Sequence, residues 1–320
     1  MKSKIIFTFK LLCFFSAFLC LHMLIELKTH GFYLQRIFAD DLPFCAEWEV
    51  APLTAQEKQS VERALEQPYT FLGAGSECFA FLSADGKTVI KFFKLDPLRP
   101  VYFRRGLFAE DHSASVHTLI PSYPFLERLP YFVQHAARRV LGMREFRIQR
   151  TFSSLKTSYE NLKEETGLLY LHLNPTQGLR KTITLYDPIG IAHQIALDGV
   201  RFYLQEKAIP LTTHFLSLKE KNDHYRTQQS LDSLFSLIIK RCSKGFADRD
   251  PYNKNFGFIG NRAIEIDTGS FIPSSLMQQP RYYKQELFYI TLELKEWAMR
   301  NYLQMLPFLD ARIAEEIVTN

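Results

Sequence analysis

The chain has 320 residues, of which 47% are hydrophobic, so it is long enough for two globular lobes and too apolar to be disordered. Its net charge of only +5 gives no indication of a nucleic-acid partner, and none is expected. The five cysteines have no paired spacing, and they therefore indicate neither a disulfide framework nor a zinc site.

Residues 1–30 form a hydrophobic N-terminal segment with three lysines before an apolar run from Leu11 to Ile25. If Lys10 snorkels, Ile5–Leu27 is long enough to cross a bilayer, and we expect an uncleaved single-pass membrane anchor. A cleaved signal peptide and a buried core helix are the alternatives, although no small-x-small cleavage site follows. The positive-inside rule would put the remainder outside the cytoplasm, where a bacterium has no ATP, so the side of the membrane stays open.

A lead-in over residues 31–67 contains an expected helix at Thr54–Glu66, which begins with a capping-box pattern. The stretch Leu72–Phe81 then combines Gly73, Gly75 and Ser76 with a strand-like run. The turn Ala84–Lys87 and the strand Thr88–Phe93, which carries Lys91, complete a hairpin pattern. Taken separately, the glycines indicate only a turn and Lys91 only a strand lysine with its head in water.

An arginine-rich insertion occupies residues 96–150. Its arginines are Arg99, Arg104, Arg105, Arg128, Arg138, Arg139, Arg144, Arg147 and Arg150. Apolar residues at helical spacing between Phe132 and Leu141 predict an amphipathic helix with Arg138 and Arg139 beside its polar face. The arginines either solvate a packed helix or contact anionic lipid headgroups or a phosphorylated substrate.

The middle of the chain alternates helix and strand patterns. We expect a helix at Phe152–Thr166, strands at Leu168–Leu173 and Arg201–Ala208, a hairpin from Thr182–Tyr186 to Ala192–Leu197, and helices at Leu231–Cys242, Phe288–Tyr302 and Phe308–Ile317. His214 and His224 have no metal-ligand spacing, and we interpret both as surface residues.

The most informative stretch is Asp248–Gly257, followed by an apolar strand and then Asp267-Thr268-Gly269. Asp250 and Asn255 lie five positions apart, and a second carboxylate follows a strand pair. One carboxylate orienting a hydroxyl, with an amide and a second carboxylate holding magnesium, is what phosphoryl transfer requires.

With these elements in this order, the chain resembles the protein-kinase-like superfamily from about residue 68 to residue 275. The resemblance implies an α+β, two-lobed fold with an antiparallel-sheet N-lobe (68–208) and a mainly helical, shortened C-lobe (209–320). It implies that Gly73, Gly75 and Ser76 cover the ATP phosphates, and that Lys91 pairs with those phosphates and with Glu160 (or Glu164 or Glu165). It implies that backbone groups around Glu206 to Ala208 bind adenine. It also implies that Asp250 positions the acceptor and that Asn255 and Asp267 hold Mg²⁺. Cys78, Asp248 and Thr268 depart from the family pattern.

The resemblance further implies an ATP-dependent kinase at a membrane. No Ala-Pro-Glu element follows Asp267, and about fifty residues follow Gly269. Both features are typical of small-molecule and lipopolysaccharide-type kinases, so we expect an anionic small molecule, a glycan or a lipid as acceptor in preference to a protein. The alternative is a catalytically silent pseudokinase that acts as a membrane-bound binding protein.

Overall fold

The computed structural model describes residues 2–38, 42–95 and 131–318, and the chain divides into two compact units. The first unit comprises Met1–Phe44, Ala55–Asp96 and Asn174–Tyr203. The second comprises Cys45–Thr54, Pro97–Leu173 and Leu204–Asn320.

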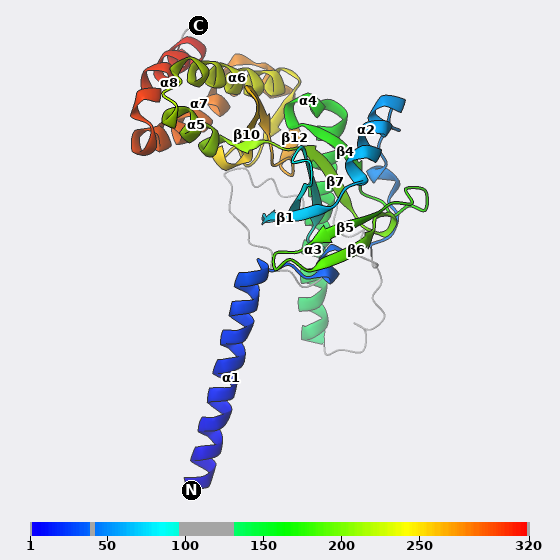
Figure 1. Ribbon diagram of the computed structural model, residues 1–320. Coiled ribbons are helices and arrows are strands. Elements are labelled where there is room, and N and C mark those ends of the chain that lie inside the picture. Colours follow the sequence, from blue (N-terminus) through cyan, green and yellow to red (C-terminus); the bar gives the residue numbers. More distant parts are fainter. Residues whose placement is uncertain (1, 39–41, 96–130, 319–320) are drawn as a thin grey trace. The chain divides into compact units, whose positions relative to one another are not determined.

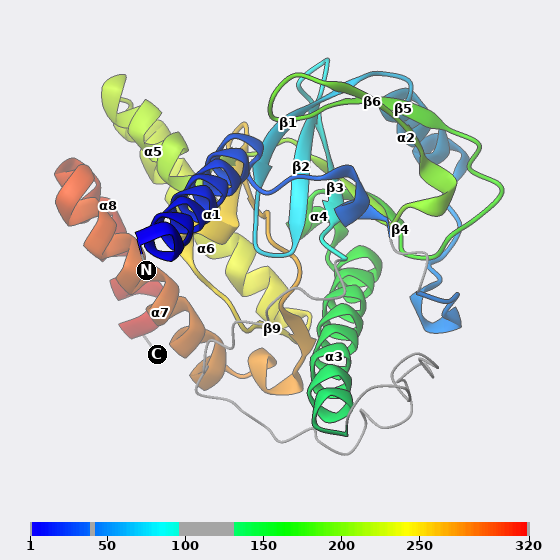
Figure 2. The ribbon, with the colours of Figure 1, turned by 90° about the horizontal axis from the view of Figure 1, so that it is seen from below.

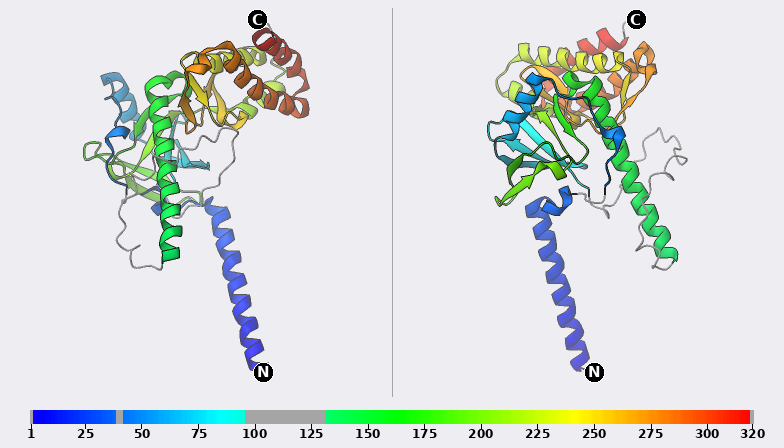
Figure 3. Two further views of the ribbon diagram at one scale, coloured as in Figure 1. Left: turned by 180° about the vertical axis from the view of Figure 1, so that it is seen from behind. Right: turned by 90° about the vertical axis from the view of Figure 1, so that its right-hand side faces the viewer.

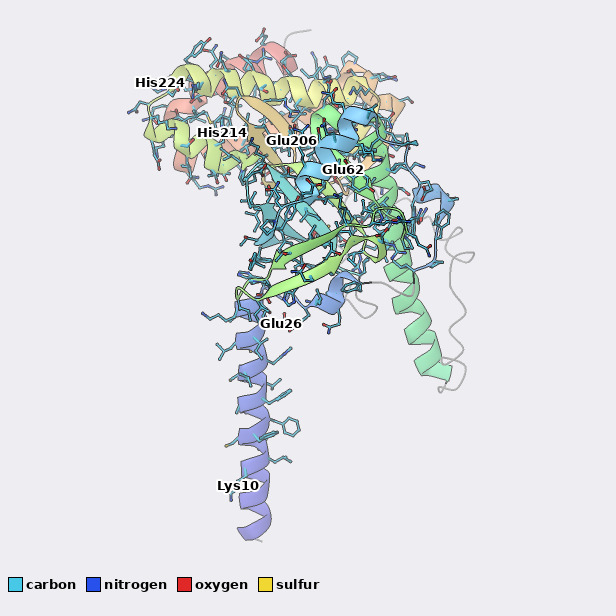
Figure 4. All side chains as sticks on the ribbon, turned by 45° about the vertical axis from the view of Figure 1, so that its right-hand side comes forward. Lys10, Glu26, Glu62, Glu206, His214 and His224 are labelled. Atoms are coloured by element: carbon cyan, nitrogen blue, oxygen red, sulfur yellow. The ribbon has the colours of Figure 1, made fainter. Side chains whose placement is uncertain are left out.

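The N-terminal segment is one helix, α1 (Lys2–Thr29), as the apolar run predicts. A helix of 28 residues is about 42 Å long at 1.5 Å per residue, which exceeds the thickness of a bilayer core. Its side chains from Lys10 onward point outward (Figure 4), and none of this stretch is buried. The helix is therefore an exposed apolar segment of the kind found in anchors and signal sequences.

A seven-stranded sheet, in the order β4-β7-β3-β2-β1-β5-β6, is the largest β-structure. Its strands are β1 (Tyr69–Ala74), β2 (Cys78–Ser83), β3 (Thr88–Phe93), β4 (Leu168–His172), β5 (Thr182–Tyr186), β6 (Ala192–Ala196) and β7 (Phe202–Glu206). Figure 2 shows β1, β2 and β3 side by side with the β5–β6 hairpin beyond them. Each predicted strand is confirmed within one or two residues, because its pattern is local.

The expected purely antiparallel sheet is wrong at one place. β5 pairs with β1 in parallel, with Tyr69 opposite Leu185 and Thr70 opposite Tyr186. A hairpin forces antiparallel pairing, but β1 and β5 are far apart in sequence, so their connection leaves the direction of β5 unconstrained. The sheet is consequently mixed.

Aromatic side chains fill the core of the first unit. Phe79 and Phe81 alternate with outward-facing residues along β2, and both are fully buried. The ring of Phe32, from the segment after α1, lies edge-on to both of them, with centroid distances of 5.1 and 5.4 Å. Helix α2 (Ala55–Leu65), within the predicted Thr54–Glu66, is tied to β1 by the Tyr69 hydroxyl, which donates to the Ala64 carbonyl at 2.9 Å.

The second unit is mainly helical, with two small sheets. Its helices are α3 (Tyr131–Asn161), α4 (Lys163–Thr166), α5 (Leu211–Glu220), α6 (His224–Ser243), α7 (Pro280–Asn301) and α8 (Leu306–Ile313). One small sheet joins β8 (Ile209–Pro210), β10 (Phe256–Ile259) and β11 (Arg262–Glu265), and the other joins β9 (Phe246–Asp248) to β12 (Phe271–Pro273). Figure 3 shows α5 to α8 gathered together, and their shared core includes Leu234, Ile238 and Leu294.

Two predictions for the second unit concern its longest helix and the arginine-rich insertion. The predicted helices around 132–141 and 152–166 are parts of one long helix, α3, which stops at Leu162 before the short α4. The side chains of Arg138 and Arg139, and residues 96–130 of the arginine-rich insertion, lie outside the described residues.

The assignment of His214 to the surface is wrong. Its ring is 6% exposed, stacks on Phe258 with a centroid distance of 4.1 Å, and shares a hydrogen bond with the Ser230 hydroxyl at 2.8 Å. Burial, helped by the charge of Lys221, lowers its pKa from 6.5 to about 4. His224 is exposed as predicted (Figure 4). The sequence could not separate the two, because only the packing of α5 on β10 buries the first.

Candidate functional site

The acidic loop between β9 and β10 brings Asp250 and Asn255 together. The Asn255 amide nitrogen donates to the Asp250 carbonyl at 2.6 Å and to its carboxylate at 3.2 Å. The Asn255 carbonyl in turn accepts from the Ile266 N–H at 2.7 Å, which places Asp267 on the neighbouring segment. Three residues separated by up to seventeen positions in the sequence thus occupy adjacent segments of the second unit.

Asp248 connects the loops that carry these residues. Its Oδ1 accepts from the Asp250 N–H at 2.9 Å and from the Ser270 hydroxyl. The Arg249 N–H also donates to the Ser270 carbonyl, at 3.2 Å. Burial raises the pKa of Asp248 to about 6, against the opposing charge of Arg241. Asp248 is therefore a buried link between the two loops.

Arg241, at the end of α6, is a fully buried cation behind the acidic loop. Its guanidinium donates to Glu265 at 2.7 Å, to Glu286 on α7, and to the Phe246 carbonyl at 3.0 Å. Burial raises the pKa of Glu265 to about 8. The charge of Arg241 opposes this rise, but Glu265 shares that one cation with Asp248 and Glu286. The network joins the strands that lead into Asp248 and Asp267.

Ser154 of α3 holds the other side of the Asp267 loop. Its hydroxyl donates to the Thr268 carbonyl at 2.7 Å and accepts from the Phe271 N–H at 2.8 Å, and all three residues are buried. Thr268 is therefore enclosed. The helix and the loop are held by two hydrogen bonds.

The sequence alone did not predict a role for three of these residues, namely Arg241, Glu265 and Ser154. A signal existed for the first two: Arg241 continues the buried stripe of Leu234 and Ile238, and Glu265 interrupts an apolar strand. A charge at a core position points to a buried partner. Ser154 has no such signal, because serine is common on ordinary helix surfaces.

The glycine-rich stretch lies in the first unit. Gly73 belongs to β1, opposite Ala80, while Gly75 and Ser76 begin the turn, in which the Gly75 N–H donates to the Cys78 carbonyl at 2.9 Å. Neither glycine has a positive φ, and a Cβ atom at Gly73 would meet nothing within 4 Å. The local fold therefore does not require glycine at either position.

Lys91 lies on β3 in the same unit, opposite Ala80, with its Nζ 5.3 Å from the centre of the Tyr203 ring. Its predicted partner Glu160 belongs to the second unit, where it lies 3.8 Å from Lys156, so the Lys91–Glu160 pair stays a prediction. The two alternative partners have other contacts, since Glu164 pairs with Lys240 and Glu165 with Lys244.

The expected adenine-binding segment follows β7. The Glu206 N–H donates to the Gly167 carbonyl at 2.8 Å, and its carboxylate pairs with Arg262. The Glu206 N–H is thus already engaged and Ala208 is buried, and adenine binding by this segment stays a prediction. Gly257 of β10 passes so close that a Cβ atom there would lie 2.8 Å from the Ile209 carbonyl, which explains this glycine.

The donor atoms of Asp250, Asn255 and Asp267 suit a hard cation. Asp250 and Asp267 supply carboxylate oxygens, and the amide oxygen of Asn255 is not the atom engaged by Asp250. Oxygen donors of this kind are those that Mg²⁺ prefers. Within residues 2–38, 42–95 and 131–318, no group of three or more His, Cys, Asp or Glu side chains is placed to hold a metal by itself.

Comparison with known proteins finds no family model that matches the sequence and no curated protein that matches it. The chemistry of the site therefore rests on its own residues.

Proposed function

We propose that the protein is a kinase-like phosphotransferase, with the two lobes formed by residues 68–208 and 209–320, that moves the γ-phosphoryl group of ATP to a hydroxyl acceptor. The observation that carries the proposal is the hydrogen-bonded pair of Asp250 and Asn255, with Asp267 on the adjoining segment. Phosphoryl transfer needs positioning and charge neutralisation more than covalent chemistry, and these residue types supply both.

Each residue has one task in this scheme. Asp250 accepts a hydrogen bond from the acceptor hydroxyl and orients its oxygen toward the phosphorus atom. Asn255 and Asp267 would hold magnesium, which neutralises phosphate charge when bound. Lys91 pairs with the ATP phosphates, and Glu160 orients Lys91.

The glycines support this role for the first unit. Gly73 faces open space, a Cβ atom at Gly75 would make only an ordinary contact with the Cys78 carbonyl at 3.8 Å, and both have ordinary backbone angles. Absence of side chains there serves no packing purpose, but it lets phosphate groups approach the backbone around Ser76.

An anionic small molecule, a glycan or a lipid is the acceptor class we favour over a protein. Only residues 270–279 separate Gly269 from α7, and this stretch is occupied by β12 and a single 3-10 turn at Ser275–Gln278. So short a segment offers little backbone on which an extended peptide could dock. We also propose that α1 is retained as a single-pass anchor, which keeps the enzyme at a membrane surface.

Replacing Asp250 with Asn tests the proposal in the full-length chain in lipid nanodiscs. Transfer of labelled γ-phosphate to a panel of glycans, lipids and proteins should fall by about 10³-fold or more, while the rise in melting temperature caused by Mg-ATP persists. Asp310→Asn is the matched control, since Asp310 makes an exposed ion pair with Lys295 on α7.

Two results would contradict the enzyme. Binding of Mg-ATP with no transfer to any acceptor would favour the pseudokinase. Cys78 and Thr268, which depart from the kinase-like pattern, support that alternative. Absence of any thermal shift at millimolar ATP, with Lys91→Ala without effect, would exclude nucleotide chemistry at this site.

A further inference from the structure

An exposed apolar patch lies at one end of the first unit, where the β5–β6 hairpin turns. Tyr186, Ile189 and Ile191 of the hairpin are 38, 55 and 52% exposed, and Leu72 of β1 is 43% exposed. Because β5 runs parallel to β1 and Thr70 pairs with Tyr186, Leu72 lies at the same end of the strands as the turn. We call these four residues the tip patch.

The tip patch lies beside the C-terminal end of α1. Figures 1 and 4 place the turn of the β5–β6 hairpin next to the point where α1 meets the sheet, close to Glu26 in Figure 4. Ring contacts agree with this placement, since His30 packs on Phe71 at 5.4 Å and Phe32 on His193 at 6.3 Å.

The junction between α1 and the sheet is held by specific bonds. The Gly31 N–H donates to the Glu26 carbonyl at 3.1 Å, and His30 and Gly31 have positive φ angles that end the helix. The Tyr33 hydroxyl bonds the Glu26 carboxylate, and Arg36 bonds the Gly31 carbonyl. These bonds fix the end of α1 within residues 26–36, and the ring contacts of His30 and Phe32 connect this segment to the sheet.

The N–H groups of the turn are already satisfied. Asp187 Oδ1 accepts from the N–H groups of Ile189 and Ile191 at 3.0 and 2.8 Å, and its Oδ2 pairs with His193 at 3.0 Å. Backbone bonds engage the N–H groups of Asp187 and Gly190. Since unsatisfied N–H groups are what makes loops costly in lipid, this turn can enter an interface at low cost.

We propose that the tip patch is a second membrane contact, which lies in the headgroup region of the same bilayer that α1 crosses. The apolar run of α1 ends at Leu27, so the residues that follow leave the hydrocarbon core at the interface. That interface is about 5–8 Å deep, and the neighbouring tip lies at its level. The patch lies beside the exposed apolar helix α1, which makes lipid the occupant that fits it.

Tryptophan quenching in the full-length protein tests this contact. Ile189→Trp is reconstituted in vesicles of phosphatidylcholine with or without bromine on the acyl chains, and wild type corrects for Trp48 and Trp297. The added emission should be strongly quenched by brominated lipid, as it should be for Leu27→Trp in α1. Lys87→Trp is the matched control: its turn lies at the opposite end of β1, where Tyr69 pairs with Ser83, and its emission should be unchanged.

Three outcomes would overturn the proposal. Quenching of Leu27→Trp without quenching of Ile189→Trp would place the tip in water. Absence of quenching at both positions would show that α1 is not in the bilayer. Shielding of Ile189→Trp from aqueous iodide without quenching by brominated lipid would identify a protein or a second copy as the occupant. Ile191→Trp repeats the test if Ile189→Trp lowers the melting temperature, and neither result depends on catalysis.

Discussion

The glycine-rich turn of the first unit and the acidic loop of the second are held in different ways. The turn is closed by the bond from the Gly75 N–H to the Cys78 carbonyl and by Lys94, whose N–H donates to the Glu77 carbonyl and whose half-buried side chain donates through Nζ to the Gly75 carbonyl at 2.6 Å. The acidic loop is bonded to the buried Asp248, while the buried Arg241 and Ser154 hold the neighbouring strand β11 and the Asp267 loop. We therefore expect the turn, which is the cover of the nucleotide in the proposed function, to open more easily than the acidic loop, which is its base.

Such a division suits phosphoryl transfer. A cover that touches phosphates must admit and release nucleotide, whereas groups that position the acceptor and metal need a fixed geometry. Local opening is easiest where few buried contacts exist. The following predictions test this contrast, first in the base and then in the cover.

Removal of the Arg241 charge should have the largest effect. Arg241→Met leaves Glu265 and Glu286 buried without their cation, which should cost about 3–5 kcal/mol of the free energy of unfolding. Urea unfolding of the full chain in detergent measures the change. Arg226→Met on the same helix is the control, because Arg226 is exposed and its pair with Asp223 should be worth less than about 1 kcal/mol. Equal losses in the two variants would show that the network does not hold the base.

Acid should weaken the second unit through His214. Its pKa is lower when folded, so the folded state binds fewer protons and stability falls as pH drops from 6.5 to about 4. The loss amounts to about 3 kcal/mol at the acid end. Asp248 acts in the opposite direction. Because its pKa is higher in the folded state, its contribution to the free energy of unfolding falls as pH rises from 3.8 to about 6.

Subtracting the pH profile of His214→Asn from that of wild type removes the contribution of Asp248 and isolates the histidine. His224→Asn, at an exposed position, should reproduce the wild-type profile. A wild-type profile that coincides with that of His214→Asn would contradict the buried, neutral ring.

Ser154→Ala should cost about 1–3 kcal/mol, because it strands the buried Thr268 carbonyl and Phe271 N–H. Thermal unfolding measures this loss. Ser243→Ala, which removes an exposed bond to the Lys240 carbonyl, is the control and should change little. Hydrogen exchange at the Phe271 N–H should accelerate only in Ser154→Ala, and an unaltered rate would count against the loop restraint.

Gly73→Ala should have the smallest effect on stability, at most about 1 kcal/mol and in the stabilising direction, since the position is open and unstrained. It should nevertheless weaken binding of Mg-ATP, measured by calorimetry, if phosphates approach the backbone there. Gly199→Ala in the same unit also enters open space and should leave nucleotide binding unaltered. Equal nucleotide affinity in both variants would show that the glycine-rich turn does not contact the nucleotide.

Local patterns sufficed for much of this protein. The apolar helix α1, the strands β1 to β3 with their Asp85-Gly86 turn, and the order of Asp250, Asn255 and Asp267 follow from residue spacing, because hairpins, helices and short loops are determined by neighbours in the sequence. The tertiary structure decided what lies between distant segments. It set the parallel pairing of β1 with β5, buried His214, and assembled the Arg241 network from α6, β11 and α7. Such features depend on which surfaces meet when the chain is packed, and no sequence window contains both partners.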